Sequence, residues 1–273
     1  MPTDKLPYHV ISYLCHDPMV TSGGVETFAR NLEHIFERVE HVTRRERDVA
    51  YVERHQMPVI CDNQLVTDWP ESVPLIGFQH GVAAVKFGLT KKPGHWLMAR
   101  GQRRAARRSN TVWAANAEWV AAASRELYGS PVRHVVYNPT DVERFDGLLT
   151  GDEPRLIRHD AGKRHKGSGL LKTIERAFPD WDFRLLPGPN PVVQDQMRHA
   201  RAFMHLSLYE GNSLVCNEAM AMDLPCLFTR VGLMQDRGGP TEVCLVDPDE
   251  MYGSRTRLVE EVGKFLESLE TRT

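Results

Sequence analysis

The chain has 273 residues, of which 41% are hydrophobic and 26% charged, and its formal net charge at pH 7 is −2. This composition is that of a globular protein, and the length accommodates two modest domains or one large one. The charge excludes a global basic field that would draw the protein to nucleic acids or membranes over long range. No apolar run reaches the roughly 18 residues that a membrane-spanning helix needs, and the N-terminal residues MPTDKLPYHV show no hydrophobic signal segment.

Five cysteines are scattered through apolar runs without CxxC spacing, namely Cys15, Cys61, Cys216, Cys226 and Cys244. An odd, dispersed set of this kind favours buried thiols in a reducing compartment over a disulfide framework. We therefore expect a cytoplasmic protein, with peripheral attachment to a membrane left open.

Short apolar runs alternate with helical patterns in the first half of the chain. The run Tyr8–Cys15 predicts a strand, and the apolar spacing within Gly24–Arg38 predicts a helix after it. Further strands are expected at Pro58–Cys61, Leu75–Phe78, Thr111–Ala115 and Val132–Tyr137, with helices at Trp96–Arg107 and Ala117–Tyr128. This alternation indicates a parallel sheet in an α/β architecture.

The pattern breaks at Asn138–Pro139–Thr140 and then repeats. The expected strands of the second series are Arg155–Arg158, Asp182–Leu186, Ala202–Leu206 and Pro225–Thr229, and the expected helices are Gly169–Phe178, Pro191–His199, Ser213–Met222 and Leu258–Leu269. The sequence thus predicts two doubly wound, Rossmann-like domains, residues 1–138 and 155–273, joined by a linker over residues 139–154. Such folds bind ligands at the carboxyl ends of their strands, and a cleft between the two domains is the expected site.

Two glutamates flank a loop of small residues in the second half. Glu210 precedes Gly211, Asn212 and Ser213, and Glu218 follows inside an expected helix. The start of that helix offers unpaired N–H groups to an anion, and Gly211 leaves room for a ligand to approach. Ionised carboxylates accept hydrogen bonds from sugar hydroxyls. The ordinary alternative is a pair of solvated surface glutamates.

The stretch EGNSLVCNEAMAMDLPCLFTRVG resembles the E-x7-E region of retaining glycosyltransferases with the GT-B fold, most closely those of family 4. It departs from the usual pattern at Asp223 and Leu233, where glycines are usual. Three further stretches resemble the family in the right order: TSGGVETFARNL (Thr21–Leu32) its first loop, Arg108–Phe145 the end of its acceptor domain, and RLIRHDAGKRHKG (Arg155–Gly167) the start of its donor domain. The chain is short for the family.

The resemblance implies an acceptor domain over residues 1–138, facing a nucleotide-sugar domain over residues 155–273 whose last helix can cross back. It implies that Glu210 binds donor-sugar hydroxyls, that Glu218 binds the ribose, and that basic side chains and loop amides hold the diphosphate. Arg158 to Lys163 has the usual spacing, whereas the Lys-Gly pair falls at Lys166, so both lysines stay candidates. The expected catalytic residues are His80, Arg158, Lys163, Lys166 and Glu210, and the expected donor-binding residues are Gly23, Gly24, Gly211, Asn212, Ser213, Leu214 and Glu218.

The function implied by the resemblance is retaining, metal-independent transfer of a sugar from a UDP- or GDP-sugar to a hydroxyl group of a polysaccharide, lipid, protein or modified nucleic-acid base. No cofactor is expected, and no metal, because the sequence has no HExxH or HxxxH motif. Two alternatives remain open: a nucleotide-sugar 2-epimerase, and a non-catalytic protein that binds sugar nucleotides or polyanions.

Three other features have two interpretations each. His80 follows an apolar run and either borders the donor sugar or is a half-buried structural histidine; Asp62 either faces the acceptor or caps a turn. The run RGQRRAARR places four arginines on one face of an expected helix: Arg100, Arg104, Arg107 and Arg108. This face either docks anionic lipid headgroups or nucleic acid, or is solvated, which is the commoner explanation of such charge runs.

Overall fold

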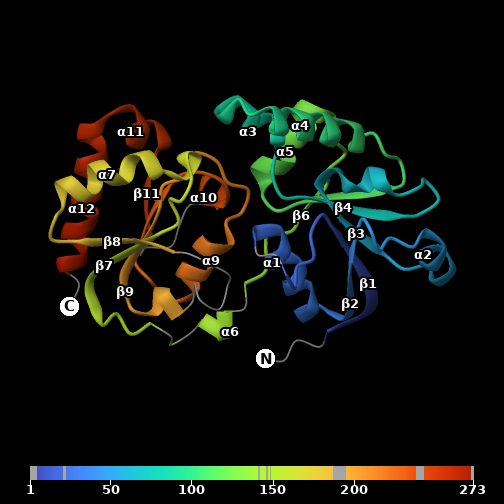
Figure 1. The fold of residues 1–273 in the computed structure, drawn as a ribbon, viewed down its shortest axis with the longest axis horizontal. Coiled ribbons are helices and arrows are strands. Elements are labelled where there is room, and N and C mark those ends of the chain that lie inside the picture. Colours follow the sequence, from blue (N-terminus) through green and yellow to red (C-terminus); the bar gives the residue numbers. More distant parts are fainter. Residues whose placement is uncertain are drawn as a thin grey trace. The chain divides into compact units, whose positions relative to one another are not determined.

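The computed structural model describes residues 5–20, 23–140, 142–145, 147, 149–186, 195–237 and 243–271. The chain divides into two compact units, Met1–Pro139 and Thr140–Thr273. Each unit is built on one sheet of parallel strands with helices on its faces (Figure 1). The predicted α/β class with two Rossmann-like domains is therefore confirmed.

The first unit contains a six-stranded sheet in the order β2-β1-β3-β4-β5-β6. Its strands are β1 (Leu6–Leu14), β2 (Phe36–Thr43), β3 (Val59–Asp62), β4 (Leu75–Gln79), β5 (Thr111–Ala115) and β6 (His134–Val135). Its helices are α1 (Gly24–Asn31), α2 (Val49–His55), α3 (Ala83–Thr90), α4 (Pro93–Ala105) and α5 (Glu118–Tyr128), with 3-10 turns at Leu32–His34 and Asn63–Asp68.

Both faces of this sheet are buried, because neighbouring residues of one strand belong to different hydrophobic clusters. In β1, Ile11 and Tyr13 pack with Trp69 and Trp113, whereas Val10 packs in a second cluster that contains Phe28. Successive side chains of a strand point to opposite faces, so two cores form, as expected for a parallel sheet covered on both sides.

The second unit contains a five-stranded sheet in the order β11-β10-β9-β7-β8. Its strands are β7 (Glu153–His159), β8 (Asp182–Leu185), β9 (Ala200–His205), β10 (Cys226–Thr229) and β11 (Val243–Val246). Its helices are α6 (Val142–Phe145), α7 (Ser168–Ala177), α9 (Leu214–Ala221), α10 (Leu233–Arg237), α11 (Pro248–Gly253) and α12 (Arg255–Glu270), with a 3-10 turn at Arg164–Lys166. Residues of α7, α11 and α12 share one hydrophobic cluster, and residues of α6 and α9 share another.

The helix predicted over Gly24–Arg38 is wrong in its second half. The helix α1 ends at Asn31, and β2 begins at Phe36. The strand β2 is an edge strand with the sequence FERVEHVT, in which one residue, Val42, is buried. Charged edge strands carry little hydrophobic alternation, so the pattern gave no strand signal there.

Several short elements have no counterpart among the predictions, namely β2, β11, α2, α3, α6, α10 and α11. The other predicted strands and helices all occur, with boundaries shifted by at most three residues, apart from the helix Pro191–His199. Of that helix, residues 191–194 lie outside the described part of the chain, and residues 195–198 are helical.

Residues 140–154, which the composition presents as part of a linker, are counted with the second unit. Phe145 of α6 is 3% exposed and lies in a hydrophobic cluster of that unit. The backbone N–H groups of Thr150 and Gly151 donate to the carbonyl oxygen of Arg198, at 2.7 and 3.0 Å. One buried phenylalanine and these bonds thus attach a segment that is otherwise poor in apolar residues.

Candidate functional site

Four charged side chains meet at the carboxyl edge of the second sheet. Asp160 follows β7, His205 ends the neighbouring strand β9, Lys166 lies in the 3-10 turn after β7, and Glu210 lies in the loop after β9. Lys166 Nζ is 2.8 Å from Asp160 Oδ2 and 3.3 Å from Glu210 Oε1. His205 Nδ1 is 2.8 Å from Asp160 Oδ1, and its Nε2 is 3.6 Å from Glu210 Oε1.

In this cluster, attraction between opposite charges shifts the pKa values more strongly than burial does. Burial by itself would raise the pKa of Asp160, but His205 and Lys166 lower it, and the net pKa falls below its usual value. Burial would likewise lower the pKa of Lys166, yet Glu210 and Asp160 raise it overall. The pKa of the buried His205 is also raised well above its usual value, against the effect of burial, with Asp160 as the main cause. Near neutral pH the site therefore holds two cations on a carboxylate scaffold.

Backbone bonds tie the turn that carries Lys166 to the loop that carries Glu210. The carbonyl oxygen of His165 accepts from Leu208 N at 2.8 Å and from Ser207 Oγ at 3.2 Å. Thr229 Oγ1, at the end of β10, donates to the carbonyl oxygen of Ser207 at 2.6 Å. The relative positions of Lys166 and Glu210 are thus set by three neighbouring strands.

Two glycines with positive φ support the same loops. Gly167 has φ +91°, and a Cβ there would lie 2.9 Å from the carbonyl oxygen of Leu206. Gly232 has φ +63°, and a Cβ there would lie 2.6 Å from the carbonyl oxygen of Gly211. Side chains other than hydrogen do not fit such close approaches to backbone. Asp223, where the resembled pattern has glycine, also takes a positive φ of 55°, a conformation that aspartate tolerates.

The loop from Glu210 leads directly into α9. Ser213 is its N-cap and makes no side-chain capping hydrogen bond. Asn212 is 6% exposed, and its Oδ1 accepts from Asn217 Nδ2 at 2.9 Å. Glu218, one turn into the helix, is 6% exposed, and Leu214 is 8% exposed. Glu210 is therefore followed in the chain by a helix N-terminus and a buried carboxylate. This combination suits the binding of a phosphate group with hydroxyl groups on either side of it.

The two candidate lysines, Lys163 and Lys166, differ in burial and in their contacts. Lys163 is exposed, whereas Lys166 is partly buried and paired with Glu210. Arg158 lies on β7, and its Nε donates to the carbonyl oxygen of Gln196 at 3.2 Å. Within the described residues, Arg158 takes no part in the ion pairs of the Lys166 cluster.

Sequence reasoning missed Asp160 and His205. Neither belongs to a recognisable motif, and only their neighbouring strands bring them together. The signal that was present is a polar residue at the end of each apolar strand: Asp160 after RLIRH and His205 in AFMHL. In adjacent parallel strands these positions meet at one edge of the sheet.

Asp160, His205 and Glu210 also form a set whose ligand atoms lie within 4.8 Å of one another, as a metal site would require. The ammonium group of Lys166 contacts both carboxylates, at 2.8 and 3.3 Å. It takes the position of a cation between them and repels a second one. These residues fit a site neutralised by lysine better than a divalent metal centre.

In the first unit, His80 and Asp62 lie together at the carboxyl ends of β4 and β3. His80 Nε2 is 3.6 Å from Asp62 Oδ1, and both side chains are largely buried. Burial lowers the pKa of His80 to about 3, so its imidazole is neutral near pH 7. Burial, and to a smaller extent Glu26, raises the pKa of Asp62 to about 7. Asn63 links the two, because it donates to Asp62 Oδ1 and its Oδ1 accepts from the backbone N–H of His80.

The titration of Asp62 gives a testable pH dependence. We expect Asp62→Asn to stabilise the protein by roughly 2–4 kcal/mol at about pH 8 and to leave its stability nearly unchanged at about pH 4. The folded state binds the Asp62 proton more tightly than the unfolded state, so this carboxyl group destabilises the fold increasingly as pH rises from its usual pKa of 3.8 to about 7. Urea unfolding of both proteins across this range measures the difference. A difference that does not change with pH would contradict the raised pKa.

Gln102, which the sequence reasoning also missed, supports the His80 loop. It is 1% exposed on α4, and its Nε2 donates to Asn63 Oδ1 at 3.2 Å and to the carbonyl oxygen of Gly81 at 2.9 Å. Its Oε1 accepts from the hydroxyl group of Tyr128 at 2.8 Å. Gln102 lies within a run of arginines, and it occupies the face of α4 that points into the domain.

Gly23 is the N-cap of α1 and Gly24 is its first residue, while Thr21 and Ser22 lie outside the described residues. A Cβ at Gly23 would lie 2.5 Å from Glu26 Oε2. The carboxylate of Glu26 therefore faces the start of this helix. An anion that binds there would have to displace it.

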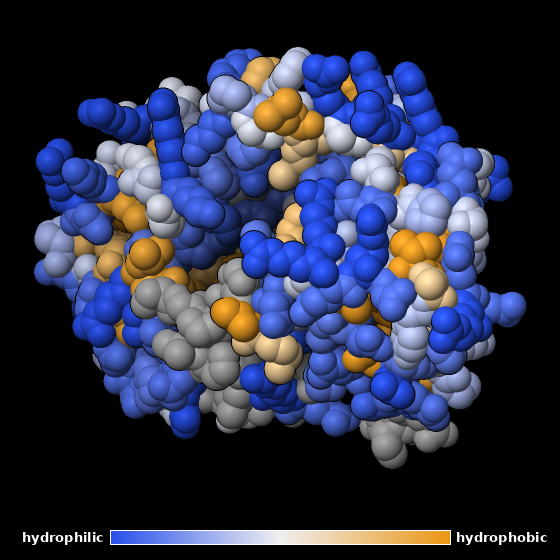
Figure 2. Space-filling model, turned by 45° about the vertical axis from the view of Figure 1, so that its right-hand side comes forward, coloured by the Kyte–Doolittle hydropathy of each residue, from blue (hydrophilic) through white to orange (hydrophobic). Residues whose placement is uncertain are grey.

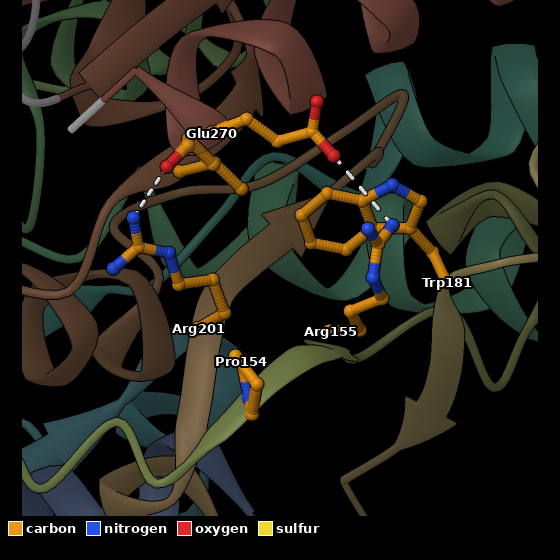
Figure 3. A pocket seen from close by; sticks show the side chains of 6 residues that line it. Pro154, Arg155, Trp181, Arg201 and Glu270 are labelled. Carbon is orange, nitrogen blue, oxygen red and sulfur yellow. Dashed lines mark hydrogen bonds and ion pairs between the residues drawn. The ribbon is translucent and has the colours of Figure 1, made fainter. Parts of the chain in front are cut away.

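A pocket of about 370 Å³ lies at the opposite, amino end of the second sheet. In Figure 3, Arg155 lies between Trp181 and Glu270, with its guanidinium 5.5 Å from the indole ring and 3.5 Å from the carboxylate. Arg201 donates to the carbonyl oxygen of Leu269. These contacts fix the end of α12 to the starts of β7 and β9. Because doubly wound sheets bind ligands at their carboxyl ends, we place the candidate site at the Lys166 cluster.

Comparisons with known proteins concern the family match and the fold. Residues 171–262 match the family described as glycosyl transferases group 1. No curated protein sequence matches the chain. Among solved structures, the chain is similar to sucrose-phosphate synthase from Thermosynechococcus elongatus, with a TM-score of 0.71 and 14% identity, covering 97% of this chain and 91% of that one.

Two further structures are similar over most of the chain. HepE from Anabaena, in complex with UDP and glucose, has a TM-score of 0.68 and 14% identity, with 96% of this chain and 91% of that one covered. The α,α-trehalose 6-phosphate synthase from Burkholderia multivorans has a TM-score of 0.60 and 10% identity, with 98% and 95% covered.

Proposed function

We propose that this protein, whose chain has the GT-B fold and matches glycosyl transferases group 1 over residues 171–262, transfers a sugar from a nucleotide-diphosphate sugar to a hydroxyl acceptor. The observation that carries the proposal is the cationic pair Lys166 and His205, held by carboxylates at the carboxyl edge of the second sheet. HepE, which shares the fold, binds UDP, glucose and UDP-glucose. We therefore favour a UDP-sugar donor.

The proposed reaction needs stabilisation of a leaving diphosphate. The bond between the anomeric carbon and the β-phosphate oxygen breaks, a bond to the acceptor oxygen forms, and the acceptor proton goes to the departing phosphate. Negative charge develops on the diphosphate in this step. Fixed positive groups, here Lys166, His205 and the first N–H groups of α9, meet that charge without reorganising. Arg158 and Lys163 join them only if their side chains turn towards the ligand.

The carboxylates then bind hydroxyl groups. Glu210 is proposed to accept from hydroxyls of the donor sugar while it holds Lys166 in place. Glu218 is proposed to accept from the ribose. In the first unit, His80 is neutral at pH 7, so its imidazole can form a hydrogen bond with a hydroxyl group without placing a positive charge there.

Replacing Glu218 tests the ribose contact. We expect Glu218→Ala to weaken the binding of UDP by about 1.5–3 kcal/mol, because a hydrogen bond from a hydroxyl to an ionised acceptor is lost. Titration calorimetry measures the affinity, and thermal unfolding of the variant without ligand shows whether the buried site remains folded. A folded variant with unchanged affinity for UDP would remove Glu218 from the donor site.

Incubation with a panel of UDP- and GDP-sugars tests the function itself. We expect one donor to release its nucleotide slowly by hydrolysis and faster in the presence of acceptors, with the anomeric configuration retained in the product. Activity is expected to survive EDTA, because Lys166 and His205 replace a divalent cation. Conversion of the donor to its epimer, or binding without any turnover, would contradict the proposal, and activity restored by manganese after chelation would contradict its metal independence.

A further inference from the structure

Helices α3 and α4 form a surface on the first unit that combines exposed apolar side chains with positive charge. Four large apolar residues are far more exposed here than in a packed helix: Leu89 (48%), Trp96 (44%), Leu97 (61%) and Met98 (41%). We call them the apolar tip. Figure 2 shows hydrophobic side chains at the top of the view, where α3 and α4 lie in Figure 1, among strongly hydrophilic ones.

All the acidic and basic residues in the chain segment that carries the apolar tip are basic. Residues 83–108 hold eight Lys or Arg and no Asp or Glu, and the rest of the chain carries 26 Lys or Arg against 36 Asp or Glu. No acidic residue occurs between Glu71 and Glu118. A protein with a net charge of −2 thus concentrates its positive charge in one segment, which orients it towards an anionic surface.

The geometry of α4 directs its basic and apolar groups outward. Gln102 and Ala105 are buried against the domain, while Leu97, Arg100 and Arg104 lie on the opposite face at helical spacing. The guanidinium of Arg100 stacks over the indole of Trp96 at 4.9 Å. Arg108, which the sequence analysis grouped with this face, lies beyond the end of the helix and donates to the carbonyl oxygen of Trp69 at 2.7 Å.

A small pocket opens beside the apolar tip. Its volume is about 220 Å³, and its lining includes Phe87, Trp96, Leu127 and Tyr128 together with Arg100 and Arg103. Apolar walls with guanidinium groups beside them suit a ligand that is apolar at one end and anionic at the other.

We infer that the α3–α4 surface docks the protein onto a bilayer that contains anionic lipids. Lysine and arginine attract such headgroups, and Trp, Leu and Met insert at the boundary of headgroups and acyl chains. A nucleic-acid backbone would match the arginines but would leave the apolar tip in water. No helix among the described residues is long and apolar enough to cross a membrane. The inference does not depend on the proposed transfer reaction.

Sedimentation with vesicles tests the inference without any activity assay. The protein is expected to bind vesicles of phosphatidylcholine mixed with phosphatidylglycerol and not vesicles of phosphatidylcholine alone, and binding is expected to weaken with added salt. Arg100→Gln with Arg104→Gln should weaken binding about 25-fold, since each basic residue near an anionic surface contributes roughly fivefold. Leu97→Gln with Met98→Gln should weaken it at least roughly tenfold, because two apolar groups no longer leave water.

Matched variants provide the controls. Arg257→Gln with Lys264→Gln removes two exposed charges from α12. Val112→Thr with Val136→Thr removes two exposed apolar groups of the first unit, one on β5 and one just after β6. Both should bind vesicles as the unmodified protein does. Equal binding by all variants, equal losses in the controls, or no binding to anionic vesicles would overturn the inference. Binding to single-stranded DNA but not to vesicles would also overturn it and identify a nucleic acid as the partner.

Discussion

Lys166→Met is expected to destabilise the second domain by about 3–5 kcal/mol and to abolish donor binding. The substitution leaves the largely buried Asp160 and Glu210 without the ammonium group that contacts both, at 2.8 and 3.3 Å. Removing one partner of a buried ion pair strands an uncompensated charge, and losses of this size are typical. Methionine keeps most of the side-chain volume, so the effect reports charge and not packing.

Lys163→Met is the matched control, because Lys163 is exposed and lies three residues earlier in the same loop. It should change stability by less than about 0.5 kcal/mol. Urea unfolding compares the two variants, and calorimetry with UDP compares their binding. Similar losses in both variants would show that the loop as a whole, and not the Lys166 cluster, carries the effect.

Gly167→Ala is expected to destabilise the protein by about 2–5 kcal/mol, as the sum of an unfavourable backbone conformation and overpacking. Gly167 has φ +91°, and a Cβ there would lie 2.8 Å from Leu206 Cβ and 2.9 Å from the carbonyl oxygen of Leu206. Leu206 is part of the backbone that leads from β9 to Glu210, so it cannot move without displacing the site. Donor affinity is therefore expected to fall together with stability.

Gly169→Ala supplies the comparison two residues away. A Cβ at Gly169 would meet no atom within 4 Å, and the residue lies in the first turn of α7. Alanine favours a helix over glycine by up to about 1 kcal/mol, so this variant should be as stable as the unmodified protein or more stable. If both substitutions behaved alike in thermal unfolding, the close approach of Gly167 to Leu206 would not be a determinant of the fold.

The sequence was sufficient to predict the interior strands and the longer helices. Strands such as β4 and β5 are short, mostly apolar and mostly buried runs, and their limits were predicted within one residue. The edge strand β2 was missed because its surface-facing residues are charged. The 3-10 turn at Arg164–Lys166 is too short for a periodic signal to stand out.

The sequence predicted only some of the residues of the candidate site. Glu210 and Glu218 could be proposed from the sequence because they flank one loop and resemble a known motif. Asp160 and His205 were not found, because 45 residues separate them and only the pairing of β7 with β9 unites them. The sequence also could not distinguish Lys163 from Lys166, because the difference lies in the folded loop. The positive φ of Gly167 ends the turn just after Lys166, and the ammonium group of Lys166 contacts Glu210.

The most direct test of the central claim is the release of nucleotide from UDP-sugars by the unmodified protein and by Lys166→Met and Lys163→Met, in the presence of EDTA. If the Lys166 cluster meets the charge of a leaving diphosphate, the unmodified protein and Lys163→Met release UDP from at least one donor, and Lys166→Met does not. Release of UDP by a folded Lys166→Met protein at the unmodified rate, or no release by the unmodified protein from any donor of the panel, would contradict the account.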